Sequence, residues 1–262
     1  MNNFALTVTD NVPQALVDQL NSFVVQSQAD KFSFFATGGS QAKLCYPALG
    51  AAIVELDNTL NNMDLYLGDE RLVPSDNEDS NTALVERLLG KQFGAAGKSL
   101  NSPTRRFDAQ LPELDQDQIH NTLELTPQQE ELLAKIARSF EESIDFSPAP
   151  RVVHLGLGPD GHIASIFPKP RTLGPILKHC ATVADVTGLN QHLRITVKLE
   201  FINQADLVIL SVTGNPKGEV LRSVLENPSQ YPAGQIEAEN FVIIVDRQAS
   251  QSLYRIQSGL DS

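Results

Sequence analysis

The segment Gly156–His162, which reads Gly-Leu-Gly-Pro-Asp-Gly-His, contains residue types suited to acid-base chemistry. It follows the apolar run Val152–Leu155, so we expect a tight turn at the end of a strand. Unperturbed imidazole titrates near neutral pH, which makes His162 a candidate general base, and Asp160 is close enough to orient the ring or to contact a substrate. A purely structural histidine is the competing interpretation. A rigid glycine-rich turn at a strand end favours the functional one.

The same segment matches the dinucleotide-binding pattern G-x-G-x-x-G by letter, and Asp185 lies near the distance expected for a ribose contact. That motif requires a helix that continues from the third glycine. Only residues 163–167 precede Pro168 and Pro170, which leaves room for little more than one helical turn. We therefore reject a dinucleotide site and predict a turn that presents His162.

A second candidate is the loop Thr37–Ser40, which follows the apolar run Phe32–Ala36 and precedes an amphipathic segment. Glycines allow backbone N–H groups to turn toward a ligand, a helix start adds partial positive charge, and hydroxyl groups can donate as well. These features predict a phosphate cradle formed by Thr37, Gly38, Gly39 and Ser40. An ordinary strand-to-helix turn fits the same residues, because such turns occur in every α/β fold.

Three cations could complete an anion site. Arg71, in the run Gly-Asp-Glu-Arg after a short strand, carries a planar guanidinium suited to phosphate, and Asp69 and Glu70 could orient it. Arg194 opens a predicted strand, and Lys217 begins a predicted helix. The carboxyl edge of a parallel sheet could bring such residues together. Taken separately, each is more typical of a solvated surface charge or a strand-end residue than of a binding site.

Short apolar, β-branched runs alternate with amphipathic stretches along the chain. This alternation predicts an α/β fold with a mostly parallel, doubly wound (Rossmann-like) sheet flanked by helices. No repeat, low-complexity tract or linker is visible, so we expect a single domain over residues 1–262. The predicted strands are Phe4–Val8, Phe32–Ala36, Asp64–Leu67, Val152–Leu155, Ala181–Val183, Ile195–Leu199, Leu207–Val212 and Phe241–Val245.

Helix starts carry clear signals. Thr126, Pro127 and Gln129 form an N-cap, a first-turn proline and a capping-box partner, and this helix should end near Ile144. The segment Gly90–Glu113 has the weakest pattern and is expected to be a surface excursion. Two further helices are predicted over Asn215–Leu225 and over Ala83–Leu89, the latter capped by Asp79 or Ser80.

Composition limits the partners. The chain has 20 Lys plus Arg against 32 Asp plus Glu, a formal charge of −12, which opposes general binding to nucleic acid. Cys45 and Cys180 lie far apart, which fits neither a disulfide framework nor a metal site, and a reducing compartment is favoured. No basic leader and no apolar stretch near the roughly 20 residues that span a bilayer is present, so we expect a cytoplasmic protein without membrane contact.

These segments, in this order and spacing, resemble the 6-phosphogluconolactonase family, which is related to the glucosamine-6-phosphate isomerases. The most specific block is 156–168, supported by 68–71 with 79–81, by Thr213-Gly214 with Lys217, and by 231–233. Two departures stand out. The family's glycine loop usually continues Ser-Thr-Pro where this chain has Ser40-Gln41-Ala42, and prolines usually precede the arginine where this chain has His192-Leu193.

The resemblance implies hydrolysis of 6-phospho-D-glucono-1,5-lactone to 6-phospho-D-gluconate in the pentose phosphate pathway, with neither metal nor organic cofactor and as a monomer or homodimer. A lactone is an activated ester, so a base for water, oxyanion donors and a phosphate anchor suffice. The expected catalytic residues are His162, Asp160 and Arg194. The expected substrate- and phosphate-binding residues are Thr37, Gly38, Gly39, Ser40, Asp69, Arg71, Gly158 and Lys217.

Two alternatives remain. An isomerase-deaminase of amino sugar phosphates would resemble Asp-Glu-Tyr where this chain has Arg71, and would place an acidic residue within the stretch that here reads Ala164–Pro168. A non-catalytic sugar-phosphate sensor would bind ligand without turnover, although a sensor has no need of a base such as His162. Ammonia release and ligand binding without turnover would distinguish these possibilities.

Overall fold

The structure is a computed structural model that describes residues 3–55, 60–95, 99–146, 149–185 and 191–257. Its main sheet has seven strands, all paired in parallel. In spatial order these are β1 (Ala5–Thr9), β11 (Phe241–Asp246), β10 (Leu207–Val212), β6 (Arg151–Gly156), β2 (Phe32–Ala36), β3 (Met63–Leu67) and β5 (Leu100–Asn101).

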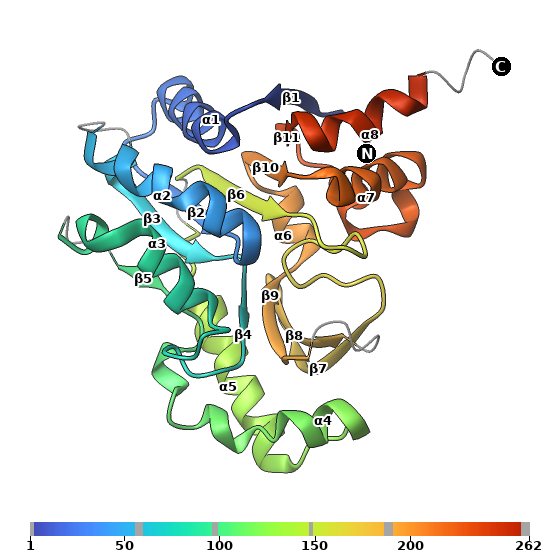
Figure 1. Cartoon of the computed structure of the whole chain (residues 1–262). Helices are drawn as coiled ribbons and strands as arrows, with labels where there is room; N and C mark the ends of the chain where they lie inside the picture. The colour runs from blue at the N-terminus through green and yellow to red at the C-terminus, as the bar shows by residue number, and fades with distance from the viewer. Residues whose placement is uncertain (1–2, 56–59, 96–98, 147–148, 186–190, 258–262) are drawn as a thin grey trace.

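Helices cover both faces of this sheet, as the sequence predicts (Figure 1). Successive strand residues point to opposite faces. Phe34 therefore packs in one apolar cluster and Phe35 in the other. The first cluster includes residues of α1 (Val12–Ser27), α2 (Gly39–Glu55) and α3 (Asn81–Ala95). The second includes residues of α5 (Pro127–Ser143), α6 (Leu199–Asn203), α7 (Asn215–Glu226) and α8 (Arg247–Gln257).

A second, four-stranded antiparallel sheet lies beside the first, in the order β4 (Asp69–Arg71), β9 (Arg194–Val197), β8 (Cys180–Asp185) and β7 (Pro170–Ile176) (Figure 1). The predicted strands Ala181–Val183 and Ile195–Leu199 belong to this sheet, and Leu199 already begins α6. The strands β4, β5 and β7 were not predicted from the sequence. A proline at the first residue of β7 lies at the edge of the sheet, where its missing N–H removes no ladder bond.

The helix predictions are confirmed in type, and α5 and α7 start where predicted, whereas α3 starts two residues earlier than predicted, at Asn81. Thr126 and Gln129 form the expected capping box of α5, and Ile144 is the residue that follows its last turn. The Ser80 hydroxyl accepts from the N–H of Ala83 at 3.2 Å, which identifies Ser80 as a cap of α3. This helix runs further than predicted, to Ala95, with a break at Gly90.

The segment Gly90–Glu113 was predicted to be a surface excursion, but part of it is buried and pairs with the main sheet. It contributes β5 to the sheet edge, and the side chains of Leu100, Thr104 and Leu111 are buried. The remaining short elements are α4 (Gln116–Thr122) and the 3-10 turns η1 (Leu60–Asn62), η2 (Arg105–Phe107), η3 (Leu111–Glu113), η4 (Pro228–Gln230) and η5 (Pro232–Gln235). Across the part of the chain that the structure describes, no helix is both long and apolar enough to cross a membrane.

Candidate active site

The strand β6 ends in a turn that presents His162. The N–H of Gly158 donates to the carbonyl of His162 at 2.9 Å, and the N–H of Gly161 donates back to the carbonyl of Gly158 at 3.1 Å. Gly161 has a φ of +79°, a conformation that favours glycine. Residues Ile163 and Ile166 then form an isolated antiparallel bridge rather than a helix, in agreement with the rejection of a dinucleotide-binding loop.

Two side chains hold the imidazole of His162 in place. Its Nδ1 lies 2.5 Å from Oδ1 of Asp160, and its ring meets that of Phe167 edge-on with centroids 5.2 Å apart. The backbone at Gly158 also packs closely against the ring, because a Cβ at this position would lie 2.2 Å from it. With Nδ1 engaged by the carboxylate, Nε2 is the nitrogen available to a water or substrate.

The surroundings of Asp160 favour its ionised form. Burial raises its pKa, but the hydrogen bonds and the charge of His162 outweigh that effect and leave the pKa below its usual value. The Asp160 side chain is 16% exposed. A carboxylate in this position accepts the Nδ1 proton, selects the tautomer with a bare Nε2, and stabilises the imidazolium that forms when Nε2 takes up a proton.

The glycine loop begins helix α2 at the edge of the main sheet. Thr37 follows the last residue of β2, and α2 starts at Gly39. The first N–H groups of a helix have no intrahelical acceptor and carry the positive end of its dipole. Lys217, from the first turn of α7, donates from Nζ to the hydroxyl of Ser40 at 3.0 Å. Burial lowers the pKa of Lys217, which is the sign of a partly desolvated cation.

Arg194 and Arg71 come from neighbouring strands of the second sheet, where they are paired in register. Arg194 is almost fully buried, and its Nη1 lies 3.6 Å from Oδ2 of Asp69. Ser165 donates to the same carboxylate oxygen at 2.6 Å. Burial lowers the pKa of Arg194, while the charge of Asp69 opposes that shift. The Asp69 carboxylate thus holds a desolvated guanidinium at the cavity wall.

Arg71 is held by the segment before α3. Its Nη1 donates to the carbonyl of Asp79 at 2.5 Å. His192, one of the departures from the family pattern, lies against the Asp79 side chain, with 3.0 Å between Nε2 and Oδ2. The residue that replaces the usual proline therefore contacts the same segment that positions Arg71.

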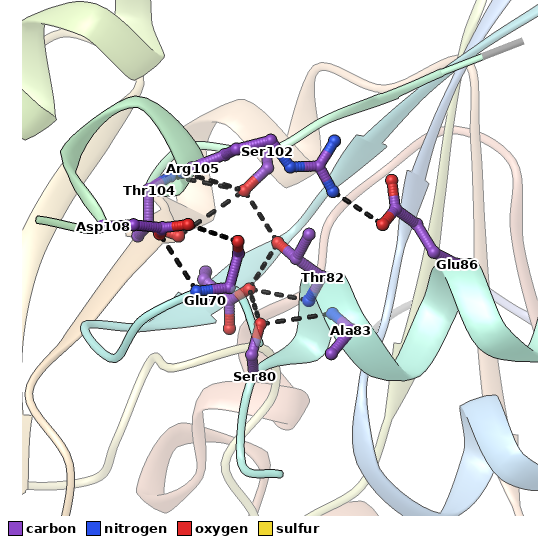
Figure 2. A network of polar contacts seen from close by, with 10 residues as sticks. Glu70, Ser80, Thr82, Ala83, Glu86, Ser102, Thr104, Arg105 and Asp108 are labelled. Atoms are coloured by element: carbon purple, nitrogen blue, oxygen red, sulfur yellow. Dashed lines mark hydrogen bonds and ion pairs between the residues drawn. The ribbon is translucent and has the colours of Figure 1, made fainter. Parts of the chain in front are cut away.

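Glu70 is the residue that fixes β4 against the start of α3 (Figure 2). Its carboxylate is fully buried. Burial raises the pKa of Glu70, and hydrogen bonds from its neighbours oppose that shift. The sequence indicated only that Glu70 could orient Arg71, whereas the structure shows a carboxylate that caps a helix. Its donors lie 2.7–3.1 Å away and are the N–H groups of Arg71, Asn81 and Thr82 and the hydroxyls of Ser80 and Thr82.

A cavity of about 180 Å³ lies where these segments meet. It is lined by every residue expected to act in the site except Asp160, which contacts His162 without lining the cavity. Those lining residues are Thr37, Gly38, Gly39, Ser40, Asp69, Arg71, Gly158, His162, Arg194 and Lys217. Within the described ranges, no group of three or more His, Cys, Asp or Glu side chains is placed to hold a metal ion.

Six further residues line the cavity and were not predicted as individual site residues. Gly156, Leu157 and Pro159 belong to the predicted turn, and Gln41, Asn81 and Ala164 lie outside it. Gln41 donates to the hydroxyl of Thr213 at 2.9 Å, and Asn81 donates to the backbone carbonyl of Asp69 at 3.0 Å. Both amides therefore join segments of the cavity wall. A signal existed for Gln41, which occupies the first turn of the helix that follows the glycine loop.

The arrangement combines a base with an anion site. His162 presents a ring nitrogen that could transfer a proton, and Arg71, Arg194 and Lys217 supply positive charge at the wall of the same cavity. Desolvated cations and helix N–H groups bind phosphate or a developing oxyanion more strongly than exposed ones do. The cavity is therefore suited to general-base attack on an anionic, oxygen-rich substrate.

The sequence matches the family described as Glucosamine-6-phosphate isomerases/6-phosphogluconolactonase over residues 7–245. The 6-phosphogluconolactonase of Haemophilus influenzae is 27% identical over 234 residues, which cover 87% of this chain and 90% of that one. The human 6-phosphogluconolactonase is 28% identical over 218 residues, with coverage of 83% and 77%.

Solved structures agree in fold. The crystal structure of 6-phosphogluconolactonase from Leishmania guyanensis has a TM-score of 0.71 at 21% identity and covers 95% of this chain and 98% of that one. A monomeric glucosamine-6-phosphate deaminase has a TM-score of 0.68 at 15% identity, with coverage of 95% and 100%. Because the family match spans nearly the whole sequence, this chain belongs to the family of glucosamine-6-phosphate isomerases and 6-phosphogluconolactonases.

Proposed function

We propose that this chain hydrolyses 6-phospho-D-glucono-1,5-lactone to 6-phospho-D-gluconate by general-base activation of water. The observation that carries the proposal is the Asp160–His162 pair at 2.5 Å, with its ring at the wall of a cavity that also holds three cationic side chains. The curated relatives with this activity are similar over most of the chain.

In the proposed reaction, Nε2 of His162 takes a proton from water while the water oxygen bonds to C1 of the lactone. The carbonyl oxygen becomes an oxyanion in the tetrahedral intermediate. Its collapse breaks the bond between C1 and the ring oxygen, and the imidazolium returns its proton to that oxygen. Asp160 stabilises the imidazolium between the two steps. Because water attacks C1 directly, no covalent intermediate with the protein is needed.

The cations have two tasks in this scheme, to hold the phosphate and to stabilise the oxyanion. Lys217 and the N–H groups after Thr37 form one group, because Lys217 contacts Ser40 of that loop. Arg71 and Arg194 form the other, on adjacent strands. Both groups are suited to anions, and Gly158 allows the close approach of the His162 ring to the backbone.

The deaminase activity found elsewhere in the family is the second candidate. That chemistry requires acid-base assistance to open a sugar ring. Among the described residues that line the cavity, Asp69 is the carboxylate, and it is already bound by Arg194 and Ser165. The stretch Ala164–Pro168 contributes no acidic side chain. These contacts favour the lactonase.

The deciding experiment measures acid release from freshly generated 6-phosphogluconolactone, corrected for spontaneous hydrolysis. We expect the wild-type protein to accelerate hydrolysis and to release no ammonia from glucosamine 6-phosphate. Ammonia release without lactone hydrolysis would replace the proposal with the deaminase. Tight binding of 6-phosphogluconate without turnover of the lactone would replace it with a sensor.

For assembly and compartment we propose a monomer or homodimer in the cytoplasm that binds neither nucleic acid nor membrane. The net charge of −12 supports the absence of nucleic-acid binding, and the buried thiols of Cys45 and Cys180, which form no disulfide, support a reducing compartment. Sedimentation equilibrium measures the mass in solution, and fractionation of cells that express the protein tests the compartment.

A further inference from the structure

A chain of polar side chains runs through the apolar core beneath the glycine loop. Tyr46 on α2, His154 on β6 and Ser211 on β10 are each fully buried. The Tyr46 hydroxyl lies 2.8 Å from the N–H of Thr37 and 3.0 Å from Nδ1 of His154, and Nε2 of His154 lies 2.9 Å from the Ser211 hydroxyl. None of these three side chains lines the cavity or takes part in the proposed reaction.

The donor and acceptor properties of these groups fix the direction of each hydrogen bond in the series. The N–H of Thr37 can only donate, so the Tyr46 oxygen accepts from it, and the Tyr46 proton then finds its acceptor in Nδ1 of His154. The other ring nitrogen of His154 carries the proton and donates to Ser211. Burial lowers the pKa of His154 to about 3 and raises the pKa of Tyr46, so both groups are neutral at physiological pH.

This series of hydrogen bonds connects the glycine loop with the strand that leads into the His162 turn. At one end it holds the backbone N–H of Thr37, the first residue of the glycine loop. At the other end Ser211 is paired in register with Gly156, the residue that begins the His162 turn, and His154 precedes that glycine by two positions. Breaking a buried link would leave a donor or acceptor without a partner, which costs about 1–3 kcal/mol.

We propose that Tyr46, backed by His154 and Ser211, is a positioning residue that sets the glycine loop for binding of the substrate phosphate. The proposal rests on the lactonase function proposed above. Tyr46 engages the N–H of Thr37 from the core side, and the residues that follow it, at the start of α2, line the cavity with the first N–H groups of that helix. The phosphate anchor thus depends on a hydrogen bond outside the cavity.

The first test is Tyr46→Phe, with Tyr66→Phe as its matched control. Tyr66 is also buried, and its hydroxyl also accepts from a backbone N–H, that of Asp145 at 3.2 Å, but it does not line the cavity. We expect Tyr46→Phe to raise KM for the phosphorylated lactone about tenfold, with kcat within about twofold of wild type. Tyr66→Phe should leave both constants unchanged. Equal KM values for the two variants, or a fall in kcat alone, would overturn the proposal.

The triple variant Tyr46→Phe, His154→Phe, Ser211→Ala separates positioning from stability, and it serves if the single variant folds poorly. Replacement of all three polar groups removes the unpaired Nδ1 without leaving the buried Ser211 hydroxyl unpartnered, and it should restore the melting temperature toward that of wild type. The N–H of Thr37 still has no partner, so KM should remain about tenfold raised. If KM returns to the wild-type value together with the melting temperature, the role of Tyr46 is structural only.

A binding measurement keeps this proposal distinct from the proposed reaction. Calorimetric titration with inorganic phosphate and with 6-phosphogluconate reports on the loop without any turnover. Weaker binding of both anions to Tyr46→Phe than to Tyr66→Phe supports the positioning role even if wild-type protein hydrolyses no lactone. Equal affinities in the two variants would exclude it even if wild-type protein is a lactonase.

Discussion

The proposed base is held by contacts that leave one ring nitrogen for chemistry. Asp160 accepts from Nδ1 of His162, and the edge of the ring meets Phe167. The guanidinium of Arg194 lies 5.8 Å from the centroid of the same Phe167 ring, so one aromatic side chain contacts both the proposed base and a cation. At the scale of single residues, the site is thus a pre-oriented base beside a desolvated positive charge.

We predict that His162→Ala lowers kcat for the phosphorylated lactone at least about a hundredfold, since this is the usual contribution of a positioned base. The matched control is His179→Ala. His179 also lies near a carboxylate, with Nε2 4.0 Å from Glu141, but it does not line the cavity. Initial rates corrected for spontaneous hydrolysis give the comparison. Near-normal turnover by His162→Ala would remove His162 from the role of base.

The lowered pKa of Asp160 also predicts a pH dependence of stability. The pKa of Asp160 is lower in the folded protein than its reference value of 3.8, so folding favours the ionised form. The stability it contributes is present above the unfolded pKa and is lost as pH falls through the folded pKa. The melting temperature of wild type should therefore exceed that of Asp160→Asn at neutral pH, and the difference should shrink below about pH 4. A difference that stays constant from pH 7 to pH 3 would contradict this.

At the scale of elements, Glu70 connects β4 to the N-terminus of α3 (Figure 2). We predict that Glu70→Gln lowers the free energy of unfolding by about 1–3 kcal/mol, because an amide presents a donor where the carboxylate accepts from several N–H groups. It should also lower activity, since Arg71 follows it directly on β4.

Glu86→Gln is the control for that variant. Glu86 lies on the same helix, and its carboxylate pairs with Arg105 at 2.6 Å, but both side chains are more than 40% exposed. An exposed pair of this kind contributes less than about 1 kcal/mol. Urea denaturation of the two variants measures the contrast. Equal losses in the free energy of unfolding would show that the buried Glu70 carboxylate contributes no more than the exposed Glu86 pair.

The elements that the sequence predicted well are those with local signals. The β-branched and aromatic runs of the main sheet, and the capping box at Thr126, can be recognised from adjacent residues alone, without knowledge of their distant partners. The strand β7 contains Pro170 and Gly174, which are typical of turns, and β4 is three charged residues long. Both become strands because they pair with β8 and β9, and such pairing has no local signature.

At the scale of the whole molecule, the site exists because the chain brings distant segments together. Lys217 and Ser40 are separated by 177 positions, and Asp69 and Ser165 by 96. The sequence could indicate that each segment ends a strand, and the rule that ligands bind at the carboxyl edge of parallel strands placed them near one another. It could not show that Glu70 would be a helix cap, or that the second sheet would carry both arginines, because those outcomes depend on long-range packing.

The net charge of −12 makes local placement of positive charge decisive for an anionic substrate. We predict that Lys217→Met raises KM for the phosphorylated lactone about 10- to 100-fold, the equivalent of one lost charge-assisted contact, and changes KM for unphosphorylated glucono-1,5-lactone little. Lys178→Met, at an exposed position outside the cavity, is the control. Both variants change the net charge equally, so they differ only in where the positive charge is removed. A similar rise in KM for both would assign the effect to the net charge and deny Lys217 a place in the phosphate site.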